Sequence, residues 1–318
     1  MATYIVRRVI QAMLVLILVS ILVFLAMRML PGDPLMIYIV QQDISFITPE
    51  MEAQLRHEFG LDKSLPMQYF DWIWGMLYGD MGRSIHYNDS VAAIMAHRVP
   101  ITMLLGVLSF IGSNVLGLLV GIVSALRRGT LLDNVLTSVA NFGICVPHFW
   151  LGVLMIYLFA LYLGWLPTQG YVSPLDDLGE CIRHLIMPVF VLSIWGMAFV
   201  ARQARSSMLE VIRQDYVRTA WAKGLQERDV VLRHVLKNAL IPVVTVIGVR
   251  LSYLIGGMVV LENVFNIPGV GRLLVAAVFS QDYQVVQSGV LIIGLSVVIV
   301  NLLVDISYGW LDPRIRFQ

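Results

Sequence analysis

Charged residues are scarce in this sequence. Only 14% of its 318 residues are Asp, Glu, Lys or Arg, and 58% are hydrophobic, whereas charged residues make up roughly a quarter of a soluble globular protein. The formal net charge is +1, so no bulk positive field favours nucleic acid or an acidic partner. These shortages exclude an ordinary soluble domain and predict a membrane protein.

Cysteine is also scarce, and the usual catalytic motifs are missing. Cys145, in an apolar run, and Cys181, in a polar segment expected to be a loop, cannot form a disulfide framework. "HEFGL" at His57 lacks the second histidine of a zinc-protease motif, and Cys145 and His148 are only an i, i+3 pair. The sequence has no G-x-x-x-x-G-K-[ST] loop, so the chain cannot bind ATP by that route. We expect neither catalysis nor a metal site.

Six apolar stretches are long enough to cross a bilayer, which takes about 20 residues of helix. They are Val9–Leu30, Ile101–Leu126, Val135–Leu163, Leu185–Ala201, Ile241–Leu261 and Ser288–Tyr308. The first is too long for a signal-peptide core, so it should stay as an anchor. Pro147 in the third predicts a kink. The predicted fold class is therefore all-α, with six membrane-spanning helices.

Lys and Arg are unevenly shared between the two sets of connecting segments. With the N-terminus inside, the inner segments hold 14 of them and the outer segments 6. The positive-inside rule then places both termini and the polar segment 202–240 in the cytoplasm. We divide the chain into the N-terminus with the first span (1–30), an extracytoplasmic insertion (31–100) in which Thr48 and Pro49 predict a helix start, and a core with five further spans (101–318).

The inner polar segment contains "DYVRTAWAKGLQERDVVLRHVLKN" from Asp215. Gly224 predicts a bend between two short helices lying along the membrane surface. Their apolar or small residues recur at helical spacing, at Val217, Ala220, Trp221, Gly224 and Leu225, and at Val231, Val235 and Leu236. The residues alone leave two interpretations open: an amphipathic helix resting on acidic headgroups, or an element that docks onto another protein.

Several motifs, in the right order along nearly the whole chain, resemble those of ABC importer permeases of the oligopeptide, dipeptide and nickel transport family. They are "RTAWAKG" followed by "KNALIP", "LPGDP" at Leu30–Pro34, "ENVFNIPGVGRLL" at Glu262–Leu274, "DYQVVQ" at Asp282–Gln287 and "LDPRIR" at Leu311–Arg316. Gln284 departs from the proline usual in the fourth motif. The resemblance implies a type I ABC importer permease fold with an extracytoplasmic insertion after the first helix.

In that family the inner polar segment carries the EAA motif, whose short coupling helices enter a groove on the ATPase subunit. The resemblance places Arg218 where the general motif has glutamate, so an acidic contact cannot be assumed. Lys237 stands where many relatives have a first proline, whereas Pro242 matches the family pattern. The implied ATPase-coupling residues are Arg218, Thr219, Ala220, Lys223, Gly224 and Leu225.

An outer gate is implied around "NIPGVG", which is too irregular for a lipid-exposed helix. Arg250 lies about nine residues into the fifth apolar stretch, where an unpaired cation is costly. It should face a water-filled path, a partner subunit or an acid, and Asp305 is a depth-mismatched candidate for that acid. A path-lining role and a structural ion pair both stay open. The predicted gate and path residues are Arg250, Glu262, Phe265, Pro268, Gly269, Gly271 and Asp282.

The function implied by the resemblance is that of a permease subunit in an ATP-driven importer of dipeptides or oligopeptides, with nickel or another metal chelate as the alternative cargo. The implied setting is a bacterial or archaeal inner membrane. The implied partners are a second homologous permease, two ATPase subunits that bind ATP-Mg, an extracytoplasmic solute-binding protein and the lipid bilayer, with no nucleic acid and no cofactor in this chain. A self-sufficient carrier would show paired halves or interrupted helices around intramembrane acids. A channel would leave the inner polar segment unexplained.

Overall fold

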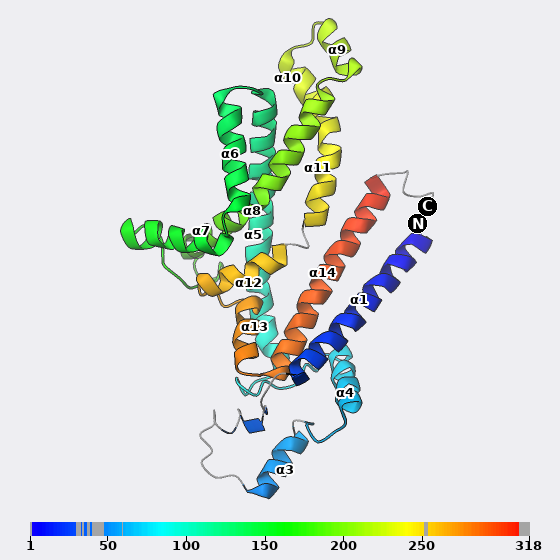
Figure 1. The fold of residues 1–318 in the computed structure, drawn as a ribbon, viewed down its shortest axis with the longest axis vertical. Coiled ribbons are helices and arrows are strands. Elements are labelled where there is room, and N and C mark those ends of the chain that lie inside the picture. The colour runs from blue at the N-terminus through cyan, green and yellow to red at the C-terminus, as the bar shows by residue number, and fades with distance from the viewer. Residues whose placement is uncertain are drawn as a thin grey trace. The chain divides into compact units, whose positions relative to one another are not determined.

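The computed structural model describes residues 2–29, 33, 35–36, 39, 48–58, 60–250 and 254–311. Figure 1 shows helices in this part of the chain, and an isolated antiparallel bridge pairs Arg83 with Ser90. The helices are α1 (Ala2–Met29), α3 (Pro49–Glu58), α4 (Leu65–Leu77), α5 (Val91–Leu126), α6 (Leu131–Cys145), α7 (His148–Met155), η1 (Ile156–Tyr162), α8 (Leu178–Val211), α9 (Asp215–Ala222), α10 (Glu227–Asp229), η2 (Val230–Val235), α11 (Leu236–Arg250), α12 (Leu254–Val264), α13 (Val270–Phe279) and α14 (Tyr283–Leu311).

The described helices include five that are long and apolar enough to cross a membrane. They cover Val6–Met29, Val91–Leu126, Leu178–Ile212, Glu227–Gly248 and Tyr283–Val304. A sixth span is reached if α6 and the helix from His148 to Tyr162 count as one, although these two are bent by 105° at their junction. Pro147 lies at that junction, so the kink predicted from it is confirmed and is a sharp break.

The fifth apolar stretch, predicted as one span from Ile241 to Leu261, does not form one helix. The candidate span runs from Glu227 to Gly248, and α11 ends at Arg250 before the separate helix α12 begins at Leu254. Hydropathy alone registers a continuous apolar run and gives no sign of a change in helix direction. The expected loop at Cys181 is also wrong, because Cys181 is buried in the first turns of α8.

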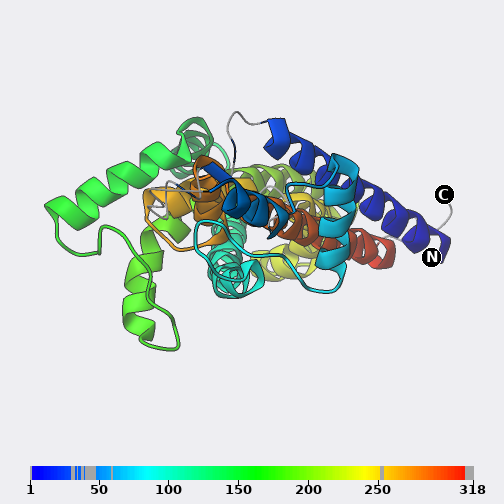
Figure 2. The same cartoon turned by 90° about the horizontal axis from the view of Figure 1, so that it is seen from below.

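The chain forms two compact units, and the first contains Met1–Thr102 and Pro268–Leu302. In this unit α1 and α14 lie side by side in both views (Figures 1 and 2). A Cβ atom placed on Gly294 of α14 would be 3.8 Å from side-chain carbons of Leu16 and Val19. A buried cluster in this unit consists of Met27, Val91, Met95, Val270, Leu273, Ala277, Tyr283, Val285 and Val286.

Two side chains of the first unit accept hydrogen bonds from backbone amides nearby in the sequence. The Thr48 hydroxyl accepts a hydrogen bond from the Met51 amide at 3.3 Å, so Thr48 caps α3 as predicted. Asp33 accepts a hydrogen bond from the Leu35 amide at 3.0 Å, and its carboxylate also pairs with Arg56. Residues 30–32 and 34 of the "LPGDP" motif lie outside the described residues.

The second unit contains Met103–Ile267 and Leu303–Gln318, and small residues let its helices α5 and α8 pack closely. A Cβ atom on Gly117 of α5 would lie 2.9 Å from the carbonyl oxygen of Met197, and one on Gly121 would lie 2.6 Å from that of Ala201. The same close approach occurs from the other side, where a Cβ atom on Gly196 of α8 would be 2.5 Å from the Cβ of Ser113 on α5. Such contacts between small residues bring helix backbones together in membrane proteins.

Candidate coupling site and gate residues

The segment 215–242, which we call the coupling segment, begins with helix α9 at one end of the second unit (Figure 1). One side of α9 is buried, with Val217 and Ala220 only 0% and 5% exposed. The opposite side carries Arg218, whose side chain is 73% exposed and pairs loosely with Asp215 at 3.7 Å. Spacing of one turn between Val217 and Ala220 produces this division, as the sequence pattern predicts. Trp221, Gly224 and Leu225, which the same pattern places on the apolar face, are instead exposed.

Gly224 ends α9 and turns the chain. Its φ of +80° lies in the left-handed region, which favours glycine, and a Cβ atom there would meet nothing within 4 Å. The Gly224 amide donates to the Trp221 carbonyl at 2.9 Å, and the Lys223 amide to the Thr219 carbonyl at 3.1 Å. The bend predicted at Gly224 is therefore confirmed, and its conformation rather than crowding requires glycine.

The second half of the coupling segment differs from the expected surface helix. From Glu227 the chain passes through α10, the π-helix η2 and α11 as one candidate span ending at Gly248. The coupling segment is therefore one short helix, a glycine bend and the beginning of a membrane span. Residues 223–226 are therefore the whole connection between α9 and that candidate span.

A compact apolar cluster holds α9 against four other helices. We call it the coupling core, and its buried members come from α5, α8, α9, η2 and α11: Ala125, Met208, Val217, Ala220, Val230, Val235 and Ala239. Burying a side chain such as that of Val217 contributes about 1.5–3 kcal/mol. Ala220, one of the predicted coupling residues, thus faces inward, whereas Arg218, Thr219, Lys223, Gly224 and Leu225 are on the exposed side.

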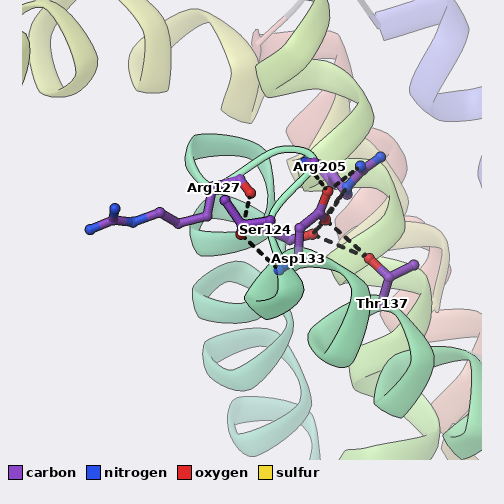
Figure 3. A network of polar contacts seen from close by, with 7 residues as sticks. Ser124, Arg127, Asp133, Thr137 and Arg205 are labelled. Atoms are coloured by element: carbon purple, nitrogen blue, oxygen red, sulfur yellow. Dashed lines mark hydrogen bonds and ion pairs between the residues drawn. The ribbon is translucent and has the colours of Figure 1, made fainter.

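The sequence analysis missed a polar cluster beside the coupling core. Asp133, buried at the start of α6, receives two hydrogen bonds from Arg205 of α8, from Nε to Oδ1 at 3.0 Å and from Nη2 to Oδ2 at 2.9 Å. Ser124 of α5 donates to the same carboxylate, as do the Gly129 amide at 3.0 Å and Thr137 at 3.3 Å. Figure 3 shows these groups pointing toward one another, while the Arg127 side chain points away.

The Asp133 cluster and the coupling core lie next to each other on two helices. On α5, Ser124 of the cluster directly precedes Ala125 of the core. On α8, Arg205 of the cluster lies one turn before Met208 of the core. Charge-assisted bidentate pairs fix orientation as well as distance. The α5–α6 turn, the end of α8 and α9 are therefore held together by one continuous set of contacts.

Three predicted gate and path residues lie in the second unit. Glu262 and Phe265 are buried in and after α12, and the Phe265 carbonyl accepts a hydrogen bond from the Gly170 amide at 2.9 Å. Arg250 is at the end of α11, where its guanidinium lies 3.8 Å from the ring centre of Phe199 and 5.3 Å from that of Trp195. Its Nη1 donates to the Gly196 carbonyl at 3.3 Å.

Arg250 therefore contacts two aromatic rings of α8 and donates a hydrogen bond to a backbone carbonyl of the same helix. The negative faces of the rings attract the positively charged guanidinium. The side chain of Asp305, the acid considered for it, lies outside the described side chains. Arg250 is the last described residue of α11, and α12 begins at Leu254.

The remaining four predicted gate residues lie in the first unit. Pro268 and Gly269 precede α13, and the Val270 amide between Gly269 and Gly271 donates to the Thr102 hydroxyl at 2.8 Å. Asp282 is fully buried before α14, where it accepts from the Val285 amide at 3.3 Å and the His86 amide at 3.2 Å, and also from the Ser84 hydroxyl. Asp282 caps α14 and ties it to the turn near residue 86.

The fold and these sites define a helical membrane protein with a short, rigidly attached polar protrusion. The family model described as "Binding-protein-dependent transport system inner membrane component" matches residues 117–317, and the model of its N-terminal region matches residues 1–106. The chain therefore belongs to the inner-membrane components of binding-protein-dependent transport systems. It is a permease subunit of ABC-type importers, and this class of subunit is not itself a catalyst.

Curated relatives match along the whole chain. A putative peptide transport system permease protein of Brucella abortus (strain 2308) is 42% identical over 318 residues, which is 100% of both chains. The di/tripeptide transport system permease protein DppB of Pseudomonas aeruginosa (strain UCBPP-PA14) is 38% identical and is matched over 94% of each chain. The family implies ATPase and solute-binding-protein partners.

The fold is also found in solved structures. An inward-facing structure of the MetNI methionine ABC transporter matches with a TM-score of 0.54 over 67% of this chain and 93% of that chain. The sequence identity is 19%, so this match shows the fold alone. It confirms the type I ABC importer permease fold expected from the sequence motifs.

Proposed function

We propose that this permease subunit pairs with a second, homologous permease to form a path for dipeptides or oligopeptides across a bacterial or archaeal inner membrane. Both termini and the coupling segment face the cytoplasm. Two ATPase subunits bind ATP-Mg and close on it, and an extracytoplasmic solute-binding protein delivers the solute. The full-length similarity to permeases named for peptide transport supports this choice of cargo.

The attachment of α9 is the observation that carries the proposal. Two buried residues fix α9 to the coupling core, while Arg218, Lys223 and Leu225 remain exposed around the Gly224 bend. An amphipathic helix resting on headgroups needs no such rigid connection to α5 and α8. A helix that receives a push from an ATPase subunit does, because the push must move the spans as rigid bodies.

The exposed side of the segment also has the composition of a protein contact. Tyr216, Trp221 and Leu225 are large and partly exposed, and aromatic residues are enriched at protein interfaces. The Tyr216 hydroxyl accepts a hydrogen bond from Asn238 at 3.1 Å, which orients its ring. We propose that Arg218, Thr219, Lys223, Gly224 and Leu225 form the surface that meets the ATPase subunit, while Ala220 secures it from inside.

Replacing Gly224 by valine tests this function in the assembled transporter. A non-glycine residue in the left-handed region costs about 1–2 kcal/mol, which corresponds to a factor of about 5–30 in population. We expect the Gly224→Val protein to insert normally, and the solute imported per ATP hydrolysed to fall by a factor in this range. The assay measures uptake and ATP hydrolysis in the same proteoliposomes.

Two further variants give the controls. Gly224→Asn also adds a side chain in open space, but asparagine tolerates the left-handed region, so it should keep most of the coupling. Gly164→Val imposes the same strain at a φ of +65° with no neighbour within 4 Å, outside the coupling segment. It should leave the uptake-to-hydrolysis ratio unchanged. Normal coupling in Gly224→Val at equal abundance would contradict the proposed role.

Gate residues provide the second part of the proposal. Glu262 and Phe265 position the segment after α12, and Pro268, Gly269, Gly271 and Asp282 position the beginning of α13 and α14. Arg250 lines the path in this proposal, and the aromatic rings of Trp195 and Phe199 hold its guanidinium in place. Uptake measured with a dipeptide and with a nickel chelate separates the proposed cargo from its alternative.

A further inference from the structure

A polar cavity in the first unit has no place in the function proposed so far. It has a volume of ≈ 320 Å³. Its wall combines the end of α1, the helix α4 with the turns on either side of it, and the first turn of α14. The residues used in the argument are Arg28, Lys63, Asp71, Trp72, Asp80 and Gln287. We call this cavity the donor pocket.

Three residues of the wall carry a buried N–H donor that has no hydrogen-bond partner among the described residues. The donors are Nη1 of Arg28, Nε1 of Trp72 and Nε2 of Gln287. Trp72 is only 8% exposed and Gln287 only 1%. Buried polar groups in proteins are nearly always hydrogen-bonded, and each exception calls for a ligand, an ion or a water molecule.

The Arg28 guanidinium is held in place by neutral groups and has no ion-pair partner among the described residues. Its Nε and Nη2 donate to Oε1 of Gln68 at 3.1 and 2.8 Å, and Gln68 in turn donates to the Lys63 carbonyl at 2.8 Å. The rings of Phe24 and Tyr283 each lie 4.6 Å from its Cζ. These neighbours are neutral, so Nη1 is a preoriented, charged donor.

Of the other charged side chains on the wall, Lys63 and Asp71 pair with each other, whereas Asp80 is bound by a backbone amide. Lys63 donates to Asp71 at 2.6 Å, and this hydrogen bond raises the pKa of Lys63. Asp80 accepts from the Gly82 amide at 2.9 Å. Among the wall residues that the structure describes, the buried groups left without a partner are donors only. The complementary ligand must therefore supply hydrogen-bond acceptors.

We propose that the donor pocket binds the carboxylate of a small solute, and that this solute is the peptide entering the transporter. The inference rests on the proposed function for the identity of the solute. A carboxylate offers two oxygens with about four lone pairs, enough for all three donors, and it neutralises the guanidinium. An uncharged acceptor such as a C-terminal amide leaves that charge unmatched.

Calorimetric titration of the purified transporter without its solute-binding protein tests this site. The transporter is held in phosphatidylcholine nanodiscs, and the probes are glycylglycine and glycylglycine amide. We expect saturable binding of the free acid and at least about tenfold weaker binding of the amide, because hydrogen bonds to charged groups are roughly twice as strong as neutral ones. Equal affinity for the two probes, or no saturable binding, would overturn the proposal.

A conservative substitution then assigns the site. Trp72→Phe removes the Nε1 donor and keeps an aromatic ring, so affinity for the free acid should fall about tenfold while affinity for the amide changes less. Trp74→Phe on the same helix is the matched control, because Trp74 is exposed and absent from the pocket wall. An unchanged affinity in Trp72→Phe, or an equal loss in Trp74→Phe, would rule out the donor pocket as the binding site.

The two proposals fail separately. Binding to the donor pocket needs no ATP, whereas the Gly224 experiment measures uptake per ATP hydrolysed. Coupled uptake without carboxylate binding rejects the donor pocket and keeps the transport function. Carboxylate binding together with normal coupling in Gly224→Val rejects the coupling role instead.

Discussion

The Asp133–Arg205 pair allows a quantitative test of how the protrusion is attached to the spans. Replacing Arg205 by methionine keeps much of the side-chain volume but leaves the Asp133 carboxylate, whose side chain is 4% exposed, without its cation. Removing one partner of a buried ion pair typically costs about 3–5 kcal/mol. Ser124, Gly129 and Thr137 still donate to Asp133, so we expect about 2–3 kcal/mol.

Changing both residues should recover most of this loss. The double variant Asp133→Asn with Arg205→Met has no buried charge, and the asparagine oxygen still accepts from the Gly129 amide. We therefore expect the double variant to lose about 1–2 kcal/mol less unfolding free energy than the two single variants lose together. This difference is within the range seen for contacting residues.

Thermal unfolding of the purified transporter measures these differences. A destabilisation of 1 kcal/mol lowers the Tm of a domain of this size by about 2–4 °C, so Arg205→Met should lower it by about 4–12 °C. Arg202→Met on the same helix is the control, because Arg202 is exposed and contacts Asn141 by one hydrogen bond of 3.2 Å. Strictly additive effects in the double variant would refute the argument that the pair acts as a unit.

Two further predictions concern packing and the path. Gly121→Ala should destabilise the protein by about 1–3 kcal/mol, since its Cβ would be 2.6 Å from the Ala201 carbonyl oxygen. Gly294→Ala is the control and should be tolerated, because its nearest neighbours lie at 3.8 Å. Equal Tm values for the two variants would contradict the close packing of α5 and α8. Arg250→Gln should lower uptake roughly tenfold at unchanged ATP hydrolysis, as expected for loss of a charged hydrogen bond, while Arg250→Lys keeps part of it. A fall in Tm without a selective loss of uptake would assign Arg250 to packing alone.

The membrane spans were predictable because a long apolar run of this kind is stable in lipid as a helix, which satisfies its own backbone hydrogen bonds. The runs gave the right class and order of helices, and Pro147 marked the break between α6 and α7. Their ends were less predictable, since α5 and α8 continue past the apolar windows to begin at Val91 and Leu178. Polar residues extend a helix beyond the hydrocarbon at no penalty, so hydropathy cannot register where the helix stops.

Tertiary contacts explain what the sequence did not reveal. Asp133 and Arg205 are 72 residues apart, and neither belongs to a periodic pattern or a motif. The available sign was an acidic residue at the edge of an apolar run, between Leu132 and Val135. The inward orientation of Ala220 and the bend at Gly224 were predictable, because helical spacing and a lone glycine are local features.

The donor pocket depends on an arrangement that local patterns cannot show. Arg28 is a cation within the apolar stretch Val9–Leu30, but its neighbours Gln68 and Tyr283 come from distant segments. Trp72 and Gln287 have no sequence feature that separates them from other buried residues. Only the folded unit places their unpaired donors around one cavity.

The central claim is that an ATPase subunit contacts the coupling segment on the cytoplasmic side, and labelling of a single cysteine tests it most directly. Cys145 and Cys181 are first replaced by serine, and Arg218→Cys then supplies one thiol at a side-chain position that is 73% exposed. We predict that a membrane-impermeant maleimide reacts with it in inside-out vesicles that contain the permease alone, and that assembly with the ATPase subunits blocks the reaction. Reaction from the outer side of the membrane, or equal reaction with and without the ATPase subunits, would contradict the account.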